Sequence, residues 1–376
     1  MDLDQLVNAH QSRRSVLRKF GTAAGVGLTL GACSWIPSAV PTSTTSSKSI
    51  DHVLIACQEN HTFDNYFGRY ARAGKFGIPS NYTQPDGQGG NIKPYHFSSH
   101  NRPDLPHTWQ AIHSEWNDGK MNGFYTTDGR EALGYYDGSD LSYYYALADA
   151  FTLCGNYFCY QLGPTLPNRI ALWAGTSGGV TSVTKIPAGS LDFPTIVDLL
   201  DAHHVSWKCY NLGLGLGSFP EVEFINALPL FKRWQHDHRL HYPATDFYND
   251  LGSGTIPQVS FLITDAFISE VDAYGMGMRV PTLVISPWVK RGYVSGHLYE
   301  HSSILKFIER RFGLPTLASV NHQFDSSTPG MYNEAARGNE NGPPAPPRDG
   351  LAHTGNFYEV LDFSQDPNYH PSLPSI

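Results

Sequence analysis

The sequence predicts an α/β protein in which a central, mostly parallel sheet is flanked by helices. Three apolar segments of strand length support this prediction, at residues 53–57, 205–210 and 257–263. An amphipathic helical segment, residues 194–203, directly precedes the second of them. A helix between two strands is typical of parallel sheets, because each crossover needs a connection long enough to hold one.

The composition indicates a globular protein with an acidic balance. The chain has 376 residues, of which 16% are charged and 13% aromatic, and its formal net charge is -8. Such a length could hold one large domain or two ordinary ones. A nucleic-acid partner is disfavoured, because binding the phosphate backbone requires a basic surface.

The first 33 residues are predicted to be an export signal. Arg13 and Arg14 form a twin-arginine pattern, and the apolar stretch at 21–32 is too short to span a bilayer, which needs about 20 residues. Residues 30–33, Leu-Gly-Ala-Cys, are typical of a lipoprotein processing site that would acylate Cys33. A plain cleaved signal is the open alternative. We expect twin-arginine export to the cell envelope surface or the medium, with membrane contact through a lipid on Cys33.

Two candidate metal ligands follow the first predicted strand. Val53–Cys57 leads into Gln58, Glu59 and Asn60, and Thr62 can cap a short aromatic helix. Ligands of open α/β sheets bind at the carboxyl ends of strands, and adjacent carboxylate and amide oxygens suit a hard divalent cation. Glu59 and Asn60 are therefore candidate ligands, unless they only cap the turn.

Thr165 is the candidate nucleophile. Residues 163–169 read Gly-Pro-Thr-Leu-Pro-Asn-Arg, and Pro167 is acceptable in a first helical turn. Thr165 is then at or just before a helix start, where unpaired N–H groups and the helix dipole favour an alkoxide or a bound phosphate. The alternative is that Thr165 is only an N-cap.

Residues 50–68 and 163–169 resemble the bacterial phosphoesterase family that contains the phospholipases C and a related group of acid phosphatases. That family combines a strand, Glu-Asn and Phe-Asp-x-Tyr-Phe-Gly with the same Gly-Pro-Thr-x-Pro-Asn-Arg, whose hydroxyl residue is the nucleophile. The resemblance implies an alkaline-phosphatase-like fold, a divalent metal of unknown identity at Glu59 and Asn60, and Thr165 as nucleophile.

Two histidines match further motifs of that family. His107 is in a His-Thr-Trp sequence, and His301 is in Glu-His-Ser-Ser at the start of a predicted helix. By resemblance His107 would contact the phosphoryl group, and His301 could reach the phosphate or the metal. Each has an alternative as an ordinary residue of a helix start.

The sequence between residues 263 and 280 departs from the family. Ser269 and Glu270 match its Ser-Glu-His, but Val271 replaces the histidine. The sequence after Val271 resembles a segment that lies several dozen residues later in relatives. The resemblance implies that one central strand–helix segment with acidic metal ligands is missing. Asp265 and Asp272 lie nearby but do not match the missing motif, and metal binding is expected to be weakened or lost.

The predicted domains are the signal at 1–33, a Ser/Thr/Pro tether at 34–49, a phosphoesterase domain at 50–320 and an irregular C-terminal extension at 321–376 packed on that domain. The sequence contains no Cys-x-x-Cys spacing, so no thiolate metal site is predicted. A disulfide between Cys154 and Cys159 is conceivable in an exported protein.

The predicted function is a phosphoric-ester hydrolase of phospholipase C type, acting on phospholipids or phosphomonoesters through a metal-activated Thr165, with impaired activity. The alternative is a non-catalytic exported paralogue that binds phosphorylated ligands. A serine esterase using Ser177, in Gly-x-Ser-x-Gly, is disfavoured because that motif needs a strand before the serine and a helix after it, and the residues that follow form a poor helix.

Overall fold

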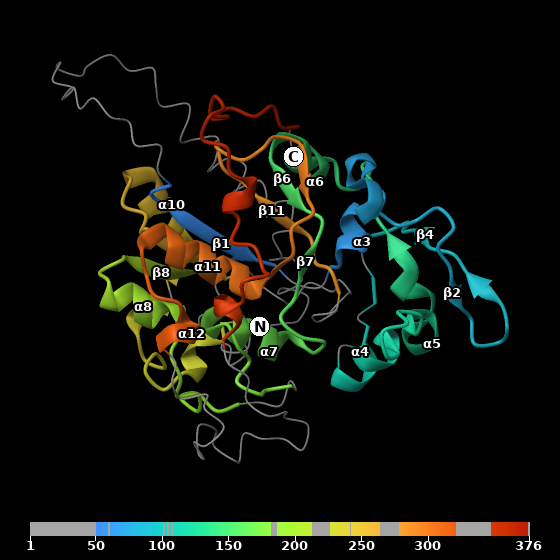
Figure 1. Cartoon of the computed structure of the whole chain (residues 1–376), viewed down its shortest axis with the longest axis horizontal. Coiled ribbons are helices and arrows are strands. Elements are labelled where there is room, and N and C mark those ends of the chain that lie inside the picture. The colour runs from blue at the N-terminus through green and yellow to red at the C-terminus, as the bar shows by residue number, and fades with distance from the viewer. Residues whose placement is uncertain are drawn as a thin grey trace, which may run out of the picture.

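The central layer is a four-stranded parallel sheet, as predicted (Figure 1). The computed structural model describes residues 50–58, 61–100, 102–103, 105–106, 108–181, 186–212, 226–240, 242–263, 278–320 and 347–374. The strand order is β1 (Val53–Cys57), β10 (Val259–Ile263), β8 (Trp207–Asn211) and β9 (Tyr242–Pro243). Every neighbouring pair is parallel, with Val53 opposite Val259 and Val259 opposite Trp207.

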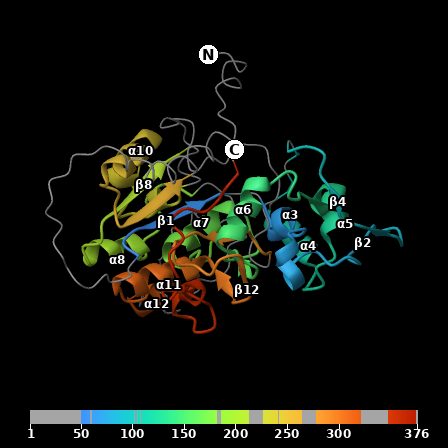
Figure 2. The ribbon, with the colours of Figure 1, turned by 90° about the horizontal axis from the view of Figure 1, so that it is seen from above.

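Three helices cover one face of this sheet. They are α7 (Thr165–Ala174), α8 (Ile196–Ala202) and α11 (His301–Phe312). Ile55 and Phe261 point to this face, and the ring of Trp173 on α7 lies 4.1 Å from that of Phe261. Figure 2 shows α8 and α11 on one side of the sheet and α10 (Ala244–Ser253) on the other.

The opposite face is covered most fully over β8. Phe247 of α10 packs against Tyr210 of β8, with ring centroids 5.3 Å apart, and Leu262 of β10 joins the same cluster. At the end of the sheet, Leu54 of β1 is 44% exposed. The central sheet therefore ends at β1 with apolar side chains in contact with solvent.

Residues Thr282–Val284 belong to a second sheet. β11 (Thr282–Val284) pairs antiparallel with β6 (Thr152–Cys154), which also pairs parallel with β12 (Tyr293–Ser295). The connection between β10 and β11 is therefore not a crossover within one parallel sheet. β7 (Tyr157–Phe158) and β13 (Tyr299–Glu300) form a further parallel pair.

The residues between β1 and β6 pack around a cluster of aromatic side chains (Figure 1). Phe63, Phe67 and Tyr136 are buried at its centre. Residues 77–100 form short strands, and Tyr95 and Phe97 anchor this stretch in the aromatic cluster. The elements here are α3 (Phe63–Phe67), η1 (Ala71–Phe76), β2 (Gln84–Pro85), β3 (Asn91–Ile92), β4 (Tyr95–His96), α4 (Trp109–Trp116), α5 (Phe124–Asp128), η2 (Gly129–Leu133), β5 (Gly134–Tyr135) and α6 (Ser142–Ala150).

The C-terminal residues 347–374 pack on the domain through aromatic and polar contacts. Phe357 stacks on Tyr299 with ring centroids 4.8 Å apart, and Val360 is fully buried. The remaining short helices are η3 (Leu228–Leu230), η4 (His238–Leu240), α12 (Leu317–Val320), η7 (Arg348–Gly350) and η8 (Tyr358–Val360). Within the described ranges, none of the helices combines the length and apolar character needed to cross a bilayer.

A buried pair of carboxyl groups joins α11, α12 and η7. Glu309 accepts a hydrogen bond from Leu317 N at 3.3 Å, and Asp349 accepts one from Ala318 N at 3.2 Å. Burial, together with the nearby Asp349, raises the pKa of Glu309 to about 9, although Lys306 opposes the shift. Because the folded-state pKa lies above the ordinary 4.5, the free energy of unfolding falls as pH rises between these two values.

We expect Glu309→Gln to remove this pH dependence, because glutamine mimics the protonated acid and keeps the oxygen that accepts from Leu317. The melting temperature of the variant, measured relative to the wild type, should rise steadily as the buffer is moved from acidic to alkaline pH. Asp192→Asn, which neutralises an exposed carboxylate, is the control and should show no such trend. If the difference in melting temperature between Glu309→Gln and wild type does not change with pH, the raised pKa of Glu309 is wrong.

Candidate active site

Thr165 is the first residue of α7 and is half-buried. Pro164 occupies the N-cap position, and no side chain caps the helix. The alternative in which Thr165 is only an N-cap is therefore wrong, because its backbone is already helical. Its hydroxyl lies at the positive end of a ten-residue helix, beside first-turn N–H groups that have no intrahelical partner.

Asn168 fixes the loop that leads into α7. Its Nδ2 donates to the carbonyl oxygens of Gly163 at 3.1 Å and Pro164 at 3.0 Å, and its Oδ1 accepts from Gln161 N at 3.0 Å. These bonds fold the loop back over the first turn of the helix. The asparagine of the Gly-Pro-Thr-Leu-Pro-Asn-Arg motif thus positions Thr165 through the backbone.

Arg169 joins the start of α7 to the end of β1. Its Nη2 donates to the carbonyl oxygen of Cys57 at 3.2 Å, and the residue is almost fully buried. Thr165 and Arg169 are four residues apart in one helix, so they lie on the same side of it. The sequence indicated Arg169 only as part of a motif, and this spacing was the signal that could have identified it as a site residue.

His301 is buried at the start of α11, and its ring contacts Tyr157 of β7. The Tyr157 Oη and His301 Nδ1 atoms are 3.0 Å apart. Burial, with a smaller effect of the positive Arg169, lowers the pKa of His301 to about 3. Burial also raises the pKa of Tyr157, so its hydroxyl keeps its proton.

His301 is therefore neutral at physiological pH, and Tyr157 is the hydrogen-bond partner of its Nδ1 atom. The protonated Tyr157 hydroxyl can donate to Nδ1 of the neutral imidazole. In that arrangement the ring proton lies on Nε2, which becomes a hydrogen-bond donor. His301 can donate to a phosphoryl oxygen, but it is not poised to act as a general base.

The other predicted site residues are Glu59, Asn60 and His107, which lie outside the described residues. Their neighbours fold as expected: Thr62 caps α3 by accepting from Asn65 N, and Thr108 caps α4 by accepting from Ala111 N. Thr165 and His301 both lie on elements that meet at the carboxyl end of β1, since α7 and α11 pack together and Arg169 reaches Cys57.

Arg279 attaches the chain to this region directly after the segment 264–277. Its Nη2 lies 2.8 Å from Asp64 Oδ1, its Nη1 donates to Gly155 O, and its own carbonyl accepts from Phe63 N. Burial raises the pKa of Asp64, and the positive charge of Arg279 opposes that shift. Asp64, the carboxylate of the first turn of α3, is thus engaged in an ion pair.

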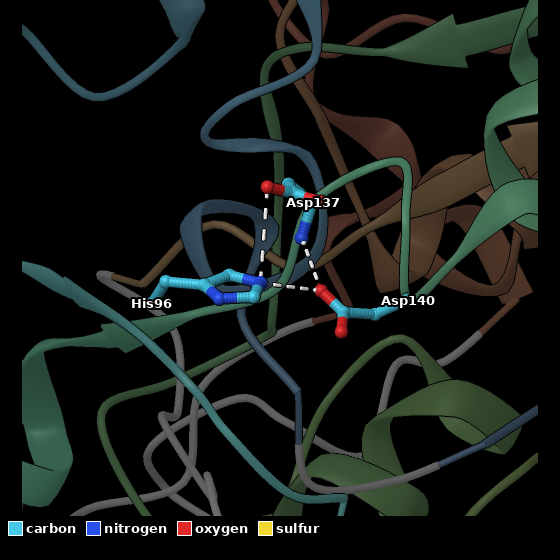
Figure 3. A group of neighbouring side chains, drawn as sticks. All are labelled: His96, Asp137 and Asp140. Atoms are coloured by element: carbon cyan, nitrogen blue, oxygen red, sulfur yellow. Dashed lines mark hydrogen bonds and ion pairs between the residues drawn. The ribbon is translucent and has the colours of Figure 1, made fainter.

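A separate group of side chains has the spacing of metal ligands (Figure 3). The potential ligand atoms of His96, Asp137 and Asp140 all lie within 4.8 Å of one another. His96 Nε2 is 2.7 Å from Asp140 Oδ2, which also accepts from Asp137 N at 2.9 Å. One imidazole and two carboxylates suit a divalent transition metal. The sequence gave no sign of the group, because β4 and the turn before α6 are distant along the chain.

The remaining sequence interpretations concern Ser177 and the cysteines. Ser177 is buried and follows the end of α7, where Gly175 has a φ of +69° and terminates the helix. No strand precedes the serine, so the disfavoured esterase motif lacks its required geometry. Cys57, Cys154, Cys159 and Cys209 are all free thiols, which contradicts the conceivable bridge between Cys154 and Cys159.

The sequence profile described as the Phosphoesterase family matches residues 50–273 and 265–315. The chain belongs to the phosphoesterase family. Its relatives include a protein named non-hemolytic phospholipase C from Pseudomonas aeruginosa, 27% identical over 467 residues that cover 89% of this chain and 65% of the relative. Phospholipase C A from Mycobacterium tuberculosis is 25% identical, over 71% of this chain and 73% of its own length.

This phosphoesterase is shorter than several relatives that it matches. It covers 61% of the non-hemolytic phospholipase C of Burkholderia pseudomallei and 53% of the hemolytic phospholipase C of Pseudomonas aeruginosa. The family suggests dependence on a metal. Besides the His96 group, the described side chains assembled at the end of β1 supply a hydroxyl, an imidazole and a guanidinium, which do not by themselves suit a divalent cation.

We expect Tyr157→Phe to let the His301 imidazole exchange between its two neutral tautomers. The protein should stay folded, because only one hydroxyl is removed. In ¹⁵N-histidine spectra, wild-type His301 should show a protonated Nε2 and an unprotonated Nδ1. In the variant the pattern should shift towards exchange between the tautomers. His301→Gln assigns the signal, and Tyr143→Phe, which removes a hydroxyl elsewhere, serves as the control. An unchanged His301 signal in Tyr157→Phe would exclude the proposed contact.

Proposed function

We propose that this phosphoesterase hydrolyses phosphoric esters in the manner of a phospholipase C, with low turnover. The observation that supports the proposal most directly is the position of Thr165 at the first residue of α7, one turn before the buried Arg169. A hydroxyl in that place has a positive electrostatic environment and a neighbouring cation suited to phosphate.

In the proposed reaction Thr165 Oγ1 attacks phosphorus, a bond between them forms, and the bond from phosphorus to the alcohol oxygen breaks. The alcohol leaves with a proton, and water then hydrolyses the phosphothreonine. Negative charge on the phosphoryl oxygens would be stabilised by the N-terminus of α7, the Arg169 guanidinium and the Nε2–H of His301. We propose that His107 adds a further contact to the phosphoryl group.

We propose that Glu59 and Asn60 hold a divalent ion near Thr165. Such an ion, when bound, lowers the pKa of the attacking hydroxyl and neutralises phosphoryl charge. A single carboxylate and an amide provide little negative charge for a divalent cation. Binding is therefore expected to be weak, which is the physical reason for the low turnover.

The comparisons support the idea that acidic ligands are missing from this chain. The alignment with the non-hemolytic phospholipase C of Pseudomonas aeruginosa extends over 467 residues, whereas this chain has 376, so the relative contains segments without a counterpart here. The family profile also matches in two stretches, 50–273 and 265–315, which meet where the sequence departs from the motif. We propose that the lost segment follows Glu270.

The proposed substrates are phospholipids, with phosphomonoesters as the second class. The named relatives are phospholipases C, and this supports a phospholipid. We further propose that the chain is exported by the twin-arginine route and that a lipid on Cys33 holds it at a membrane surface. The substrate and the enzyme would then share one interface.

The second candidate function is a non-catalytic exported protein that binds phosphorylated ligands. The neutral His301 and the buried Arg169 favour it, because both can bind phosphate without a metal. In that case the site would retain affinity for phosphate after losing turnover.

We expect Thr165→Val, which keeps the shape of the side chain, to reduce turnover about a thousandfold or more, because the nucleophile is removed. Thr165→Ser retains a hydroxyl and should keep measurable activity. Turnover is measured on p-nitrophenyl phosphate and on phosphatidylcholine vesicles, with added Mg²⁺, Mn²⁺ or Zn²⁺ and with a chelator.

Wild-type turnover that persists in Thr165→Val would overturn the role of Thr165. Absence of turnover in the wild type, combined with calorimetric binding of inorganic phosphate that Arg169→Gln abolishes, would favour the binding protein. Sensitivity of any activity to a serine-directed fluorophosphonate, lost in Ser177→Ala, would instead indicate an esterase.

A further inference from the structure

One aromatic side chain from the C-terminal part of the chain covers the strand pair that leads to His301. β7 and β13 run parallel, with Tyr157 opposite Tyr299. The ring of Phe357 stacks on that of Tyr299 at a centroid distance of 4.8 Å and on that of Tyr157 at 6.3 Å. All three rings are buried. Phe357 therefore ties the two strands together, although it lies far beyond both of them in the sequence.

The backbone of Phe357 has an unusual conformation. Its φ and ψ angles are +62° and −9°, in the left-handed region that residues with a side chain rarely adopt. Such a conformation costs free energy and persists only where the surrounding contacts enforce it. Here Asn356 N donates to the Glu359 carboxylate at 3.2 Å, and Tyr358 N donates to Asn356 Oδ1 at 3.3 Å. This turn presents the ring of Phe357 to the two tyrosines.

Gly355 lets the same turn approach β13 closely. Its N–H donates to Leu298 O at 2.7 Å, just before the strand begins. A Cβ atom at position 355 would lie 2.3 Å from Cε1 of Tyr299, so any larger residue would displace that ring. The turn and the Tyr299 ring therefore fit together only because glycine stands there.

Lys306 attaches the turn to α11. Its Nζ donates to Leu351 O at 2.7 Å and to Thr354 Oγ1 at 3.1 Å. His301 is the first residue of this helix and directly follows β13. The C-terminal turn is thus fixed to both of the elements between which His301 lies.

The hydroxyl of Tyr157 is the point where this packing reaches the candidate site. A ring in a close-packed interior turns only as far as its neighbours allow, so the stacked Phe357 helps to fix the plane of Tyr157. That plane sets the direction of Oη towards His301 Nδ1, 3.0 Å away. Because hydrogen bonds weaken steeply when they are misaligned, loss of the Phe357 ring would loosen the contact between Tyr157 and His301.

We propose that Phe357 is a positioning residue of the candidate active site, and that it holds Tyr157 in the orientation that directs His301 towards a bound phosphoryl group. The inference rests on the proposed function, in which the Nε2–H of His301 binds a phosphoryl oxygen. Phe357 itself touches no substrate. The family profile ends at residue 315, so this contribution comes from a part of the chain outside the family match.

Spectra of the full-length protein labelled with ¹⁵N-histidine test this role without any need for turnover. Phe357→Leu removes the ring but keeps an apolar side chain, and the His301 signal, assigned with His301→Gln, should move towards exchange between the two neutral tautomers. Phe357→Tyr keeps the ring and should retain the wild-type signal. Phe247→Leu is the matched control, because Phe247 is also buried but lies on the opposite face of the central sheet. It should lower the melting temperature without changing the His301 signal.

Three outcomes of these spectra would overturn the proposal. The first is a folded Phe357→Leu variant with the wild-type His301 signal. The second is an equal change in Phe247→Leu, which would report a general loosening of the core. The third is a Phe357→Tyr variant that behaves like Phe357→Leu, because the ring would then not be the cause. If Phe357→Leu does not fold, Phe357→Met, whose flexible side chain fills more of the space, takes its place.

Calorimetric titration with inorganic phosphate connects the orientation of His301 to ligand binding. Phe357→Leu should bind phosphate about tenfold more weakly than wild type, because a hydrogen bond to a charged oxygen is weakened. Phe247→Leu should bind like wild type. Unchanged affinity in Phe357→Leu would overturn the connection of Phe357 to the site. Absence of phosphate binding in the wild type, together with the expected His301 spectra, would refute the proposed phosphate site and support the positioning of His301, so the two failures are distinct.

Discussion

The contact between Arg169 and the carbonyl oxygen of Cys57 is the constraint on which the candidate site depends. It joins the first turns of α7 to the last residue of β1, with 3.2 Å between the Nη2 and O atoms. The same helix is held to the sheet by the packing of Trp173 on Phe261. Thr165 cannot move relative to the end of β1 without breaking a buried charged hydrogen bond or this aromatic contact, either of which costs stability.

The electrostatics around Thr165 follow from that arrangement. Arg169 adds a positive charge close to His301, and together with burial it keeps that imidazole neutral. The region therefore combines one fixed cation, the positive end of α7 and a neutral donor. This set suits an anionic phosphate whether or not a metal is present, whereas activation of the hydroxyl needs an additional base or metal ion. In the proposed function, phosphate binding and turnover would thus depend on different groups, so the two candidate functions can be separated by experiment.

Local patterns in the sequence predicted the elements that build the site, and distant contacts set its chemistry. The boundaries of β1 follow from a continuous apolar run. The start of α7 follows from Gly163 and from Pro167, which is tolerated in a first helical turn. The partner of His301 lies on a strand far away in sequence, so no local pattern could reveal its tautomer. The same reason hid the group formed by His96, Asp137 and Asp140, and it hid the antiparallel pairing of β11 with β6.

The proposed loss after Glu270 would explain both the exposed side of β1 and the weak metal binding that we propose for Glu59 and Asn60. A segment that supplied both a strand and acidic ligands had two roles, so its removal has two consequences. One is less negative charge at the proposed metal site. The other is an apolar face at the end of the sheet, visible as Leu54 in solvent.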